Sequence, residues 1–243
     1  MEKDELKVKL KEVFTIDNVF EYTKRTIFLI IGLMIMSCGV AMSILASLGT
    51  SPISSIPYVL NIITNLSVGT TTIIVNVLIV LLQIILLRKR FKWIQLLQIP
   101  VCIIFGLFND LALYIFDFIV VTEYWQQWLL CIVGIILVAF GVICEVTAKV
   151  STLPGEGLVL TLCQLFPKVK FGYMKVAVDC SLVIIAVILS FIFLQGLYAV
   201  REGTIAAAIF VGLTARVVNK FMIPFGNFLF KKHNHNKEVQ QSI

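Results

Sequence analysis

The sequence predicts an all-α polytopic membrane protein, and two observations support this fold class. Hydrophobic residues make up 59% of the 243 positions and charged residues only 14%. The mean hydropathy is +1.00, a value far above that of soluble domains. The apolar residues also form long unbroken runs, several of which match the about 20 residues that a helix needs to cross a bilayer. We therefore expect most of the chain to lie in a membrane.

Eight apolar segments follow one another along the chain. Six of them are long enough to cross a bilayer, whereas 52–66 and 154–166 are too short. Both short segments open with a proline, Pro52 or Pro154, and proline is favoured in the first turn of a helix. The eight segments are 26–48, 52–66, 70–87, 94–117, 126–148, 154–166, 173–195 and 203–227.

The eight segments fall into two sets of four that resemble each other. Gly32 and Gly39 in the first set recur as Gly134 and Gly141 in the second, 102 positions later in each case. The same offset relates three further pairs near the first short segments, and slightly larger offsets relate pairs further on. Several matches in one order predict an internal duplication. These further pairs are Thr50/Thr152, Pro52/Pro154, Leu60/Leu162, Gly69/Gly172, Asn76/Asp179 and Gly106/Gly212.

The distribution of basic residues favours six membrane crossings over eight. With six, the two short segments are re-entrant or broken helices, and the second repeat is inverted relative to the first. All 20 Lys and Arg residues except Arg201 and Arg216 then lie on the cytoplasmic side, as the positive-inside rule requires. Eight crossings in parallel repeats would move the RKRFK loop (88–92) outside, and this arrangement remains the alternative.

The six-crossing architecture divides the chain into five parts. Residues 1–25 form a cytoplasmic amphipathic segment, and residues 228–243 form a cytoplasmic polar tail. Between them lie membrane repeat 1 (26–117), an outer loop (118–125) and membrane repeat 2 (126–227).

The stretch STLPGEGLVL (151–160) is unusual in so apolar a chain. Pro154, Gly155 and Gly157 break the helical pattern, as Pro52 does in the first repeat, and glycine permits close backbone approach. Glu156 then falls in the first turn of a short helix, where the helix dipole stabilises a negative charge. Hydroxyl residues precede both breaks, namely Thr50 and Ser51 in one repeat and Thr152 in the other. Glu156 either lines a membrane-embedded site or caps a loop at the headgroups.

Other ionisable residues lie within apolar segments, where charge is expensive and often functional. Asp179 and Lys175 share a helix face at i, i+4 spacing, and the six-crossing topology makes Arg216 a better predicted partner for Asp179. The polar candidates for a substrate or ion site also include Asp110 and Asn76. Glu145 and Lys149 are interpreted as a structural ion pair at the membrane interface.

These motifs resemble those of the YczE/YyaS/YitT-type group of bacterial integral membrane proteins. The similarity covers residues 26 to 225 and implies a multipass helical fold in a bacterial inner membrane. It implies no substrate. The matching residues are SLGTSP (47–52), PGEGL (154–158), Lys175, Asp179 and REGT (201–204).

The residue types narrow the classes of function. The six cysteines are scattered through apolar segments and the two histidines lie in the polar tail, so no metal, haem or other cofactor is expected. No motif of an intramembrane enzyme is present. We expect a small-solute transporter or the substrate-binding subunit of one, and the alternative is a regulatory or scaffolding membrane protein. The expected partners are the lipid bilayer, a small molecule or ion, and a second copy or a separate membrane subunit, but no nucleic acid.

Overall fold

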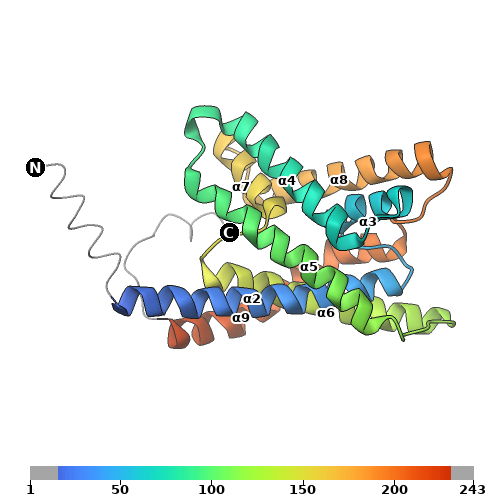
Figure 1. Cartoon of the computed structure of the whole chain (residues 1–243), viewed down its shortest axis with the longest axis horizontal. Coiled ribbons are helices and arrows are strands. Elements are labelled where there is room, and N and C mark those ends of the chain that lie inside the picture. Colours follow the sequence, from blue (N-terminus) through green and yellow to red (C-terminus); the bar gives the residue numbers. More distant parts are fainter. Residues whose placement is uncertain (1–15, 231–243) are drawn as a thin grey trace, which may run out of the picture.

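The structure, a computed structural model, describes residues 16–230, and this part of the chain is built of helices joined by short turns (Figure 1). Six of the helices are long and apolar enough to cross a membrane, which confirms the predicted fold class. Residues 1–15 and 231–243 lie outside the described part, and with them most of the predicted N-terminal segment and polar tail. The helices are α2 (Ile16–Leu45), α3 (Pro52–Thr64), α4 (Val68–Leu87), the 3₁₀ turns η1 (Arg88–Arg90) and η2 (Trp93–Leu97), α5 (Gln98–Phe116), α6 (Tyr124–Ala148), α7 (Pro154–Leu165), α8 (Phe171–Leu194) and α9 (Glu202–Leu229).

The helix boundaries follow the predicted segments closely, with one difference at the N-terminus. Helix α2 already begins at Ile16, so residues 16–25 form the first turns of the first long helix. Glu21 and Arg25 form an i, i+4 ion pair of 3.0 Å on these turns. The polar end of α2 therefore continues the apolar part without a break.

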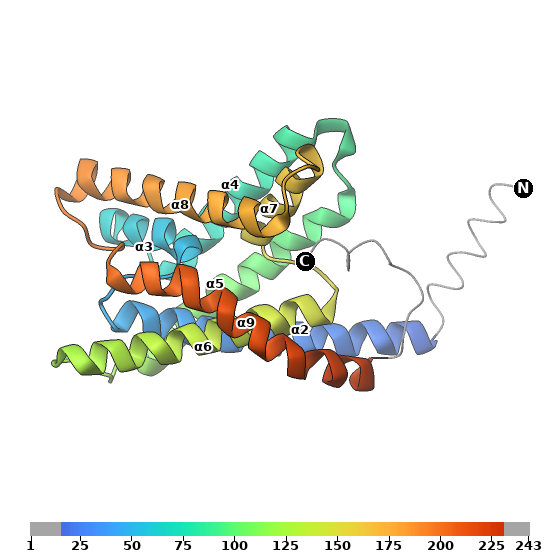
Figure 2. The same ribbon diagram turned by 180° about the vertical axis from the view of Figure 1, so that it is seen from behind.

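The six long helices run back and forth between two ends of the molecule. Helices α2, α5 and α8 run in one direction and α4, α6 and α9 in the other (Figures 1 and 2). We call the end at which α2 starts the basic end, because the η1 turn (Arg88–Arg90) lies there. Helix α7 lies toward the basic end and α3 toward the opposite end. Neither short helix runs from end to end, which agrees with six crossings and not with eight.

The long helices form two groups that pack against each other. Helix α2 packs on α5 and α6, and α6 also packs on α9. In the other group, α4 packs on α3 and α7, and α8 packs on the same two short helices, while contacts between α4 and α5 join the groups. Buried apolar side chains fill each group, with Leu33 and Met36 in the first and Val59 and Val159 in the second.

Glycines permit the close crossing of α2 and α6. A Cβ atom on Gly39 would lie 2.7 Å from the carbonyl oxygen of Gly134, and one on Gly141 would lie 2.7 Å from that of Gly32. Small residues at such positions let two helix backbones approach within a membrane. The four glycines that recur in the two predicted repeats therefore serve to pack α2 against α6.

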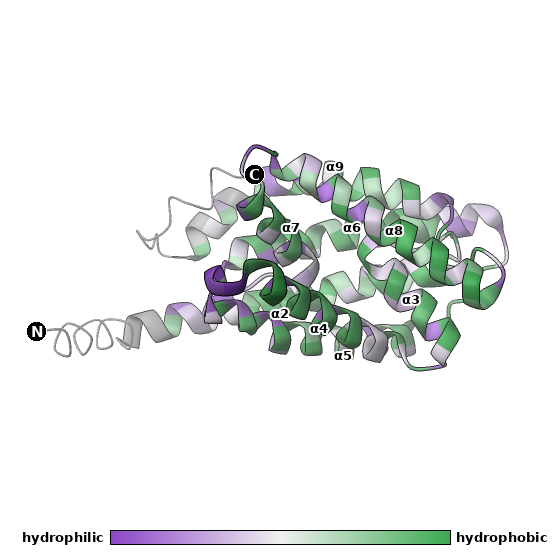
Figure 3. Cartoon of the chain, turned by 90° about the horizontal axis from the view of Figure 1, so that it is seen from above, coloured by the Kyte–Doolittle hydropathy of each residue, from purple (hydrophilic) through white to green (hydrophobic). Residues whose placement is uncertain are grey.

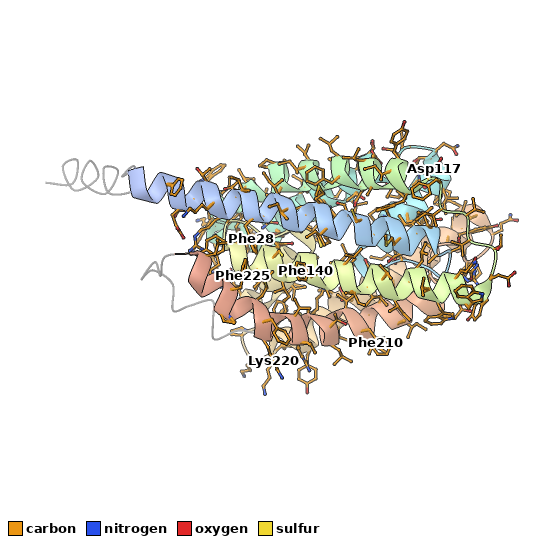
Figure 4. All side chains as sticks on the ribbon, turned by 90° about the horizontal axis from the view of Figure 1, so that it is seen from below. Phe28, Asp117, Phe140, Phe210, Lys220 and Phe225 are labelled. Carbon is orange, nitrogen blue, oxygen red and sulfur yellow. The ribbon has the colours of Figure 1, made fainter. Side chains whose placement is uncertain are left out.

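The outer surface is apolar along the helices and polar at the turns (Figure 3). Exposed aromatic and aliphatic side chains cover the long helices, as expected for contact with lipid. Side chains from α2, α6 and α9 meet near the basic end, where the rings of Phe28 and Phe225 lie 6.3 Å apart (Figure 4). These aromatic contacts connect the end of α9 with the start of α2.

Candidate functional site

A buried carboxylate organises the start of α7. Lys149 adopts the left-handed conformation, with a φ of 54°, and ends α6, so the following residues turn back toward the helix they have just left. Glu145, in the last turn of α6, is only 1% exposed, and its Oε1 accepts a hydrogen bond of 2.6 Å from the backbone N–H of Leu153. Leu153 is the N-cap residue of α7. Glu145 thus satisfies an N–H group that the geometry of a helix start leaves free.

A second carboxylate, that of Glu156, meets Glu145 at this point. Glu156 lies in the first turn of α7, as the sequence predicts, and its side chain is within hydrogen-bonding reach of Glu145. The Oε2 atoms of both residues are buried, and neither has a hydrogen-bond donor from the protein. Two carboxylate oxygens can only accept, so a hydrogen bond between these side chains requires a proton on one of them.

Helix α8 adds a lysine and an aspartate to this site. The Nζ of Lys175 lies 3.0 Å from Oδ1 of Asp179, and both side chains are mostly buried. The positive charge of Lys175 also attracts Glu145. Three elements, α6, α7 and α8, thereby bring four ionisable side chains together. We call Glu145, Glu156, Lys175 and Asp179 the carboxyl cluster.

Two glutamine side chains fix α7 from the opposite side. Gln83 on α4 and Gln98 on α5 are buried and exchange hydrogen bonds of 3.1 and 3.3 Å through their amide groups. Gln83 also donates a bond of 3.0 Å to the carbonyl oxygen of Pro154. A Cβ on Gly157 would lie 2.7 Å from the Gln98 amide, so a larger residue here would displace that amide.

The starts of the two short helices meet. A Cβ on Gly155 would lie 2.9 Å from Cδ1 of Ile53, and these residues follow Pro154 and Pro52 respectively. The hydroxyl residues predicted for a binding site lie beside this junction, but their hydrogen bonds are local. Thr50 Oγ1 donates to the carbonyl of Ser51, whose own Oγ bonds the Ser54 hydroxyl at 3.1 Å. Thr152 is half-buried in the loop before α7.

Asp110 and Arg216 lie apart from the carboxyl cluster. Asp110, on α5, accepts hydrogen bonds of 2.7 Å from Ser67 and 2.6 Å from the N–H of Gly69. It therefore caps the start of α4 and joins two helices. Arg216 is exposed on α9. Asn76 is buried on α4.

Two predicted ion pairs are replaced by other contacts. Asp179 pairs with Lys175 instead of Arg216, because α8 packs on α3 and α7 while α9 packs on α6. Lys149 is exposed, and Glu145 turns inward to Leu153 and Glu156. The loop that returns from the end of α6 covers Glu145, and its burial makes the interfacial ion pair wrong.

Comparison with known proteins places this architecture in a family. A family model described as a family of unknown function, DUF6198, matches residues 23–220. The chain belongs to this family. It is also 27% identical over 136 residues to the uncharacterized protein YyaS of Bacillus subtilis (strain 168). The match covers 56% of this chain and 66% of YyaS, just under two thirds of that relative. No solved structure matches. The resemblance to YyaS-type proteins is confirmed.

Sequence reasoning missed Gln83 and Gln98 as site residues, and it assigned Glu145 only to an ion pair at the membrane interface. Each of the three places a polar side chain within an apolar segment of the sequence, and polar groups at such positions are rarely without a partner. That signal was available for all three residues. Their common contact with the first turn of α7 depends on the tertiary arrangement.

Proposed function

We propose that this protein is a small-solute transporter of the bacterial cytoplasmic membrane, with both termini in the cytoplasm and a solute site where α3 and α7 meet. The observation that carries the proposal is the contact between Ile53 and Gly155. It joins the starts of two short helices that enter from opposite ends of the molecule. Discontinuous helices whose N-termini meet at depth are the usual frame of a transporter site.

The helix contacts support the predicted inverted duplication on which alternating access depends. Ile53 and Gly155 are 102 positions apart, so the residues in contact are equivalent in the two repeats. The same holds at the crossing of α2 and α6. The contact of Gly39 with Gly134 becomes that of Gly141 with Gly32 when the repeats are exchanged. Equivalent residues that touch one another are expected along a two-fold axis.

The carboxyl cluster supports a site with a polar ligand. Charged groups at depth in a membrane cost about 2.5–3.5 kcal/mol each on insertion scales and usually mark a solute or ion pathway. Gly155 and Pro154 link the cluster directly to the junction of the short helices. A solute bound at that junction would lie beside the first turn of α7 and would feel the charge on Glu156.

Ligand binding to purified protein tests this function. Thermal melting in detergent is recorded with a panel of amino acids, nucleosides, sugars, polyamines and organic anions, since a ligand that binds the folded state raises the melting temperature. We expect at least one compound to raise it, and Glu156→Gln or Asp179→Asn to abolish that shift. Glu202→Gln, at an exposed site at the far end, is the matched control and keeps it.

The opposite result would favour the alternative function. If no compound shifts the melting of the folded protein, and both cluster variants only unfold earlier, the charges are structural. Transport is then abandoned for a regulatory or scaffolding role. If a compound binds equally well to both variants, the solute site lies elsewhere and the junction of α3 and α7 loses its assignment.

A further inference from the structure

The carboxyl groups of Glu145 and Glu156 meet in a buried place where the protein offers neither Oε2 atom a hydrogen-bond donor. Both Oε2 atoms are buried without a donor, while the two side chains lie within hydrogen-bonding reach. Glu145 Oε1 is already used by the N–H of Leu153. Two carboxyl groups that meet in a buried site are unlike two separate acids, because repulsion between like charges disfavours ionisation of both and favours one shared proton.

The neighbouring groups leave room for one additional positive charge. Lys175 on α8 attracts Glu145, but it already forms an ion pair with Asp179. The carboxyl cluster therefore contains three carboxyl groups but only one ammonium group, that of Lys175. The packed helices α4 and α5 contribute only the neutral amides of Gln83 and Gln98.

The other basic groups near this end are either paired elsewhere or exposed, and the residues of the η1 turn (Arg88–Arg90) are among the exposed ones. Arg25 on α2 pairs with Glu21 and donates a hydrogen bond of 3.3 Å to the carbonyl oxygen of Ala148. Lys149 is exposed beyond the end of α6. Neither has a contact with Glu145 or Glu156, so these residues supply no second positive charge to the pair.

We propose that Glu145 and Glu156 together bind one exchangeable proton, and that this proton is the ion to which transport is coupled. Uptake of a proton from water leaves one carboxyl group neutral, and its O–H donates to the other carboxylate. Release of that proton to water leaves both groups charged. The second half of the proposal rests on the proposed transport function, whereas the first half does not.

The position of Glu156 connects the proton to the solute site. When the proton leaves, repulsion between the two carboxylates separates the first turn of α7 from α6. That turn contains Gly155, which touches Ile53 at the start of α3. Loss of the proton therefore alters the junction at which we place the solute, and the two ligands influence each other through about one helical turn.

A proton fits this site better than a metal ion does. Hard cations take about six or more oxygen ligands, and no group of three His, Cys, Asp or Glu side chains suited to a metal occurs among residues 16–230. Glu145 can offer only Oε2, because Leu153 holds Oε1. Two facing carboxyl groups suffice for a proton.

Infrared spectroscopy of the full-length protein in lipid nanodiscs detects the proton directly. The C=O stretch of a protonated carboxylic acid is separate from the bands of carboxylates, and it is followed while the pH is raised from neutral. We expect such a band in the wild type at neutral pH, with loss at higher pH. Glu145→Gln abolishes the band, and Glu156→Gln moves its loss to lower pH, since Glu145 then stays buried beside Lys175 but no longer faces a second carboxylate. Glu202→Gln retains it.

Three results would overturn the proton site. These are the absence of the band in the wild type, its survival with unchanged pH dependence in both cluster variants, or its loss on exchange of potassium for sodium at constant pH, which would identify a sodium site. Glutamine keeps an acceptor for the Leu153 N–H, and Glu156→Gln tests the site by itself if Glu145→Gln does not fold. Size-exclusion profiles and circular dichroism verify each variant.

The coupling between solute binding and proton binding is measured in a separate experiment. A solute that raises the melting temperature is added to weakly buffered protein with a pH-indicator dye. Coupling predicts a pH step that Glu156→Gln lacks, and an unchanged pH in the wild type would overturn it. The band is measured without solute. If the infrared band is present but no solute raises the melting temperature, transport alone is refuted. If a solute raises the melting temperature but the band is absent, the proton site alone is refuted.

Discussion

We call the line along which α4 meets α5 the first seam and the line along which α8 faces α9 the second seam. Both are made of equivalent segments of the two predicted repeats, yet only in the first are the two helices in close backbone contact. A Cβ on Gly69 would overlap the carbonyl oxygen of Gly106, so the two backbones touch. Gly172 and Gly212, at the equivalent positions, have nothing within 4 Å of their added Cβ atoms. Asp110 reinforces the first seam by capping α4, whereas Arg216 stands exposed at the equivalent place on α9.

This difference predicts which pair of helices can shift with the smaller loss of contacts. Helices α4 and α5 form one unit, held by backbone contact and by charge-assisted hydrogen bonds. Helix α8 instead packs on the short helices, and α9 on α6. A shift of α8 against α9 therefore breaks fewer contacts than a shift of α4 against α5. The half with the looser seam is also the half that contains the carboxyl cluster.

The largest expected effect concerns the orientation of the two repeats. Leu66, after α3, and Lys168, after α7, lie in equivalent turns, and both are exposed. In an inverted arrangement they face opposite sides of the membrane. In a background without native cysteines, we expect an impermeant maleimide to label Leu66→Cys on intact cells. Lys168→Cys should react only after the membrane is opened.

Labelling of both positions from the same side would contradict the inverted arrangement, because the repeats would then be parallel. Glu123→Cys, in the outer loop, serves as the matched control for access from outside. Equal labelling of Leu66→Cys and Glu123→Cys with protection of Lys168→Cys would place the basic end in the cytoplasm.

Much of this architecture could be predicted from the sequence because helix boundaries are encoded locally. Pro52 and Pro154 open α3 and α7 as expected, and Glu156 lies in the first turn of its helix. The partners of the buried charges could not be predicted in this way. Helical spacing correctly paired Lys175 with Asp179, but it also paired Glu145 with Lys149, whose side chain is exposed. The inward turn of Glu145 depends on the left-handed residue that ends α6 and on the return of the chain, and neither is visible in periodicity.

The next effect concerns the glycines of the two seams. Gly69→Ala places a methyl group against the backbone of Gly106, and such overpacking costs about 1–3 kcal/mol or more. Gly172→Ala meets open space, and alanine is a better helix former than glycine, so stability changes by less than about 1 kcal/mol and in the favourable direction. Melting temperatures of both variants in the same detergent provide the measurement. Equal losses would show that the second seam is also closed.

The smallest expected effect is the change in stability when the charged residue of each seam, Asp110 or Arg216, is replaced by alanine. Asp110→Ala leaves the N–H of Gly69 without its acceptor and removes the bond from Ser67, so we expect a loss of about 1–3 kcal/mol. Arg216→Ala removes an exposed side chain and should change stability by no more than about 0.5 kcal/mol. Denaturant titration of the purified variants gives both values. A cost at Arg216 equal to that at Asp110 would mean that α9 is also held through its charge, and the two seams would then differ only in their glycines.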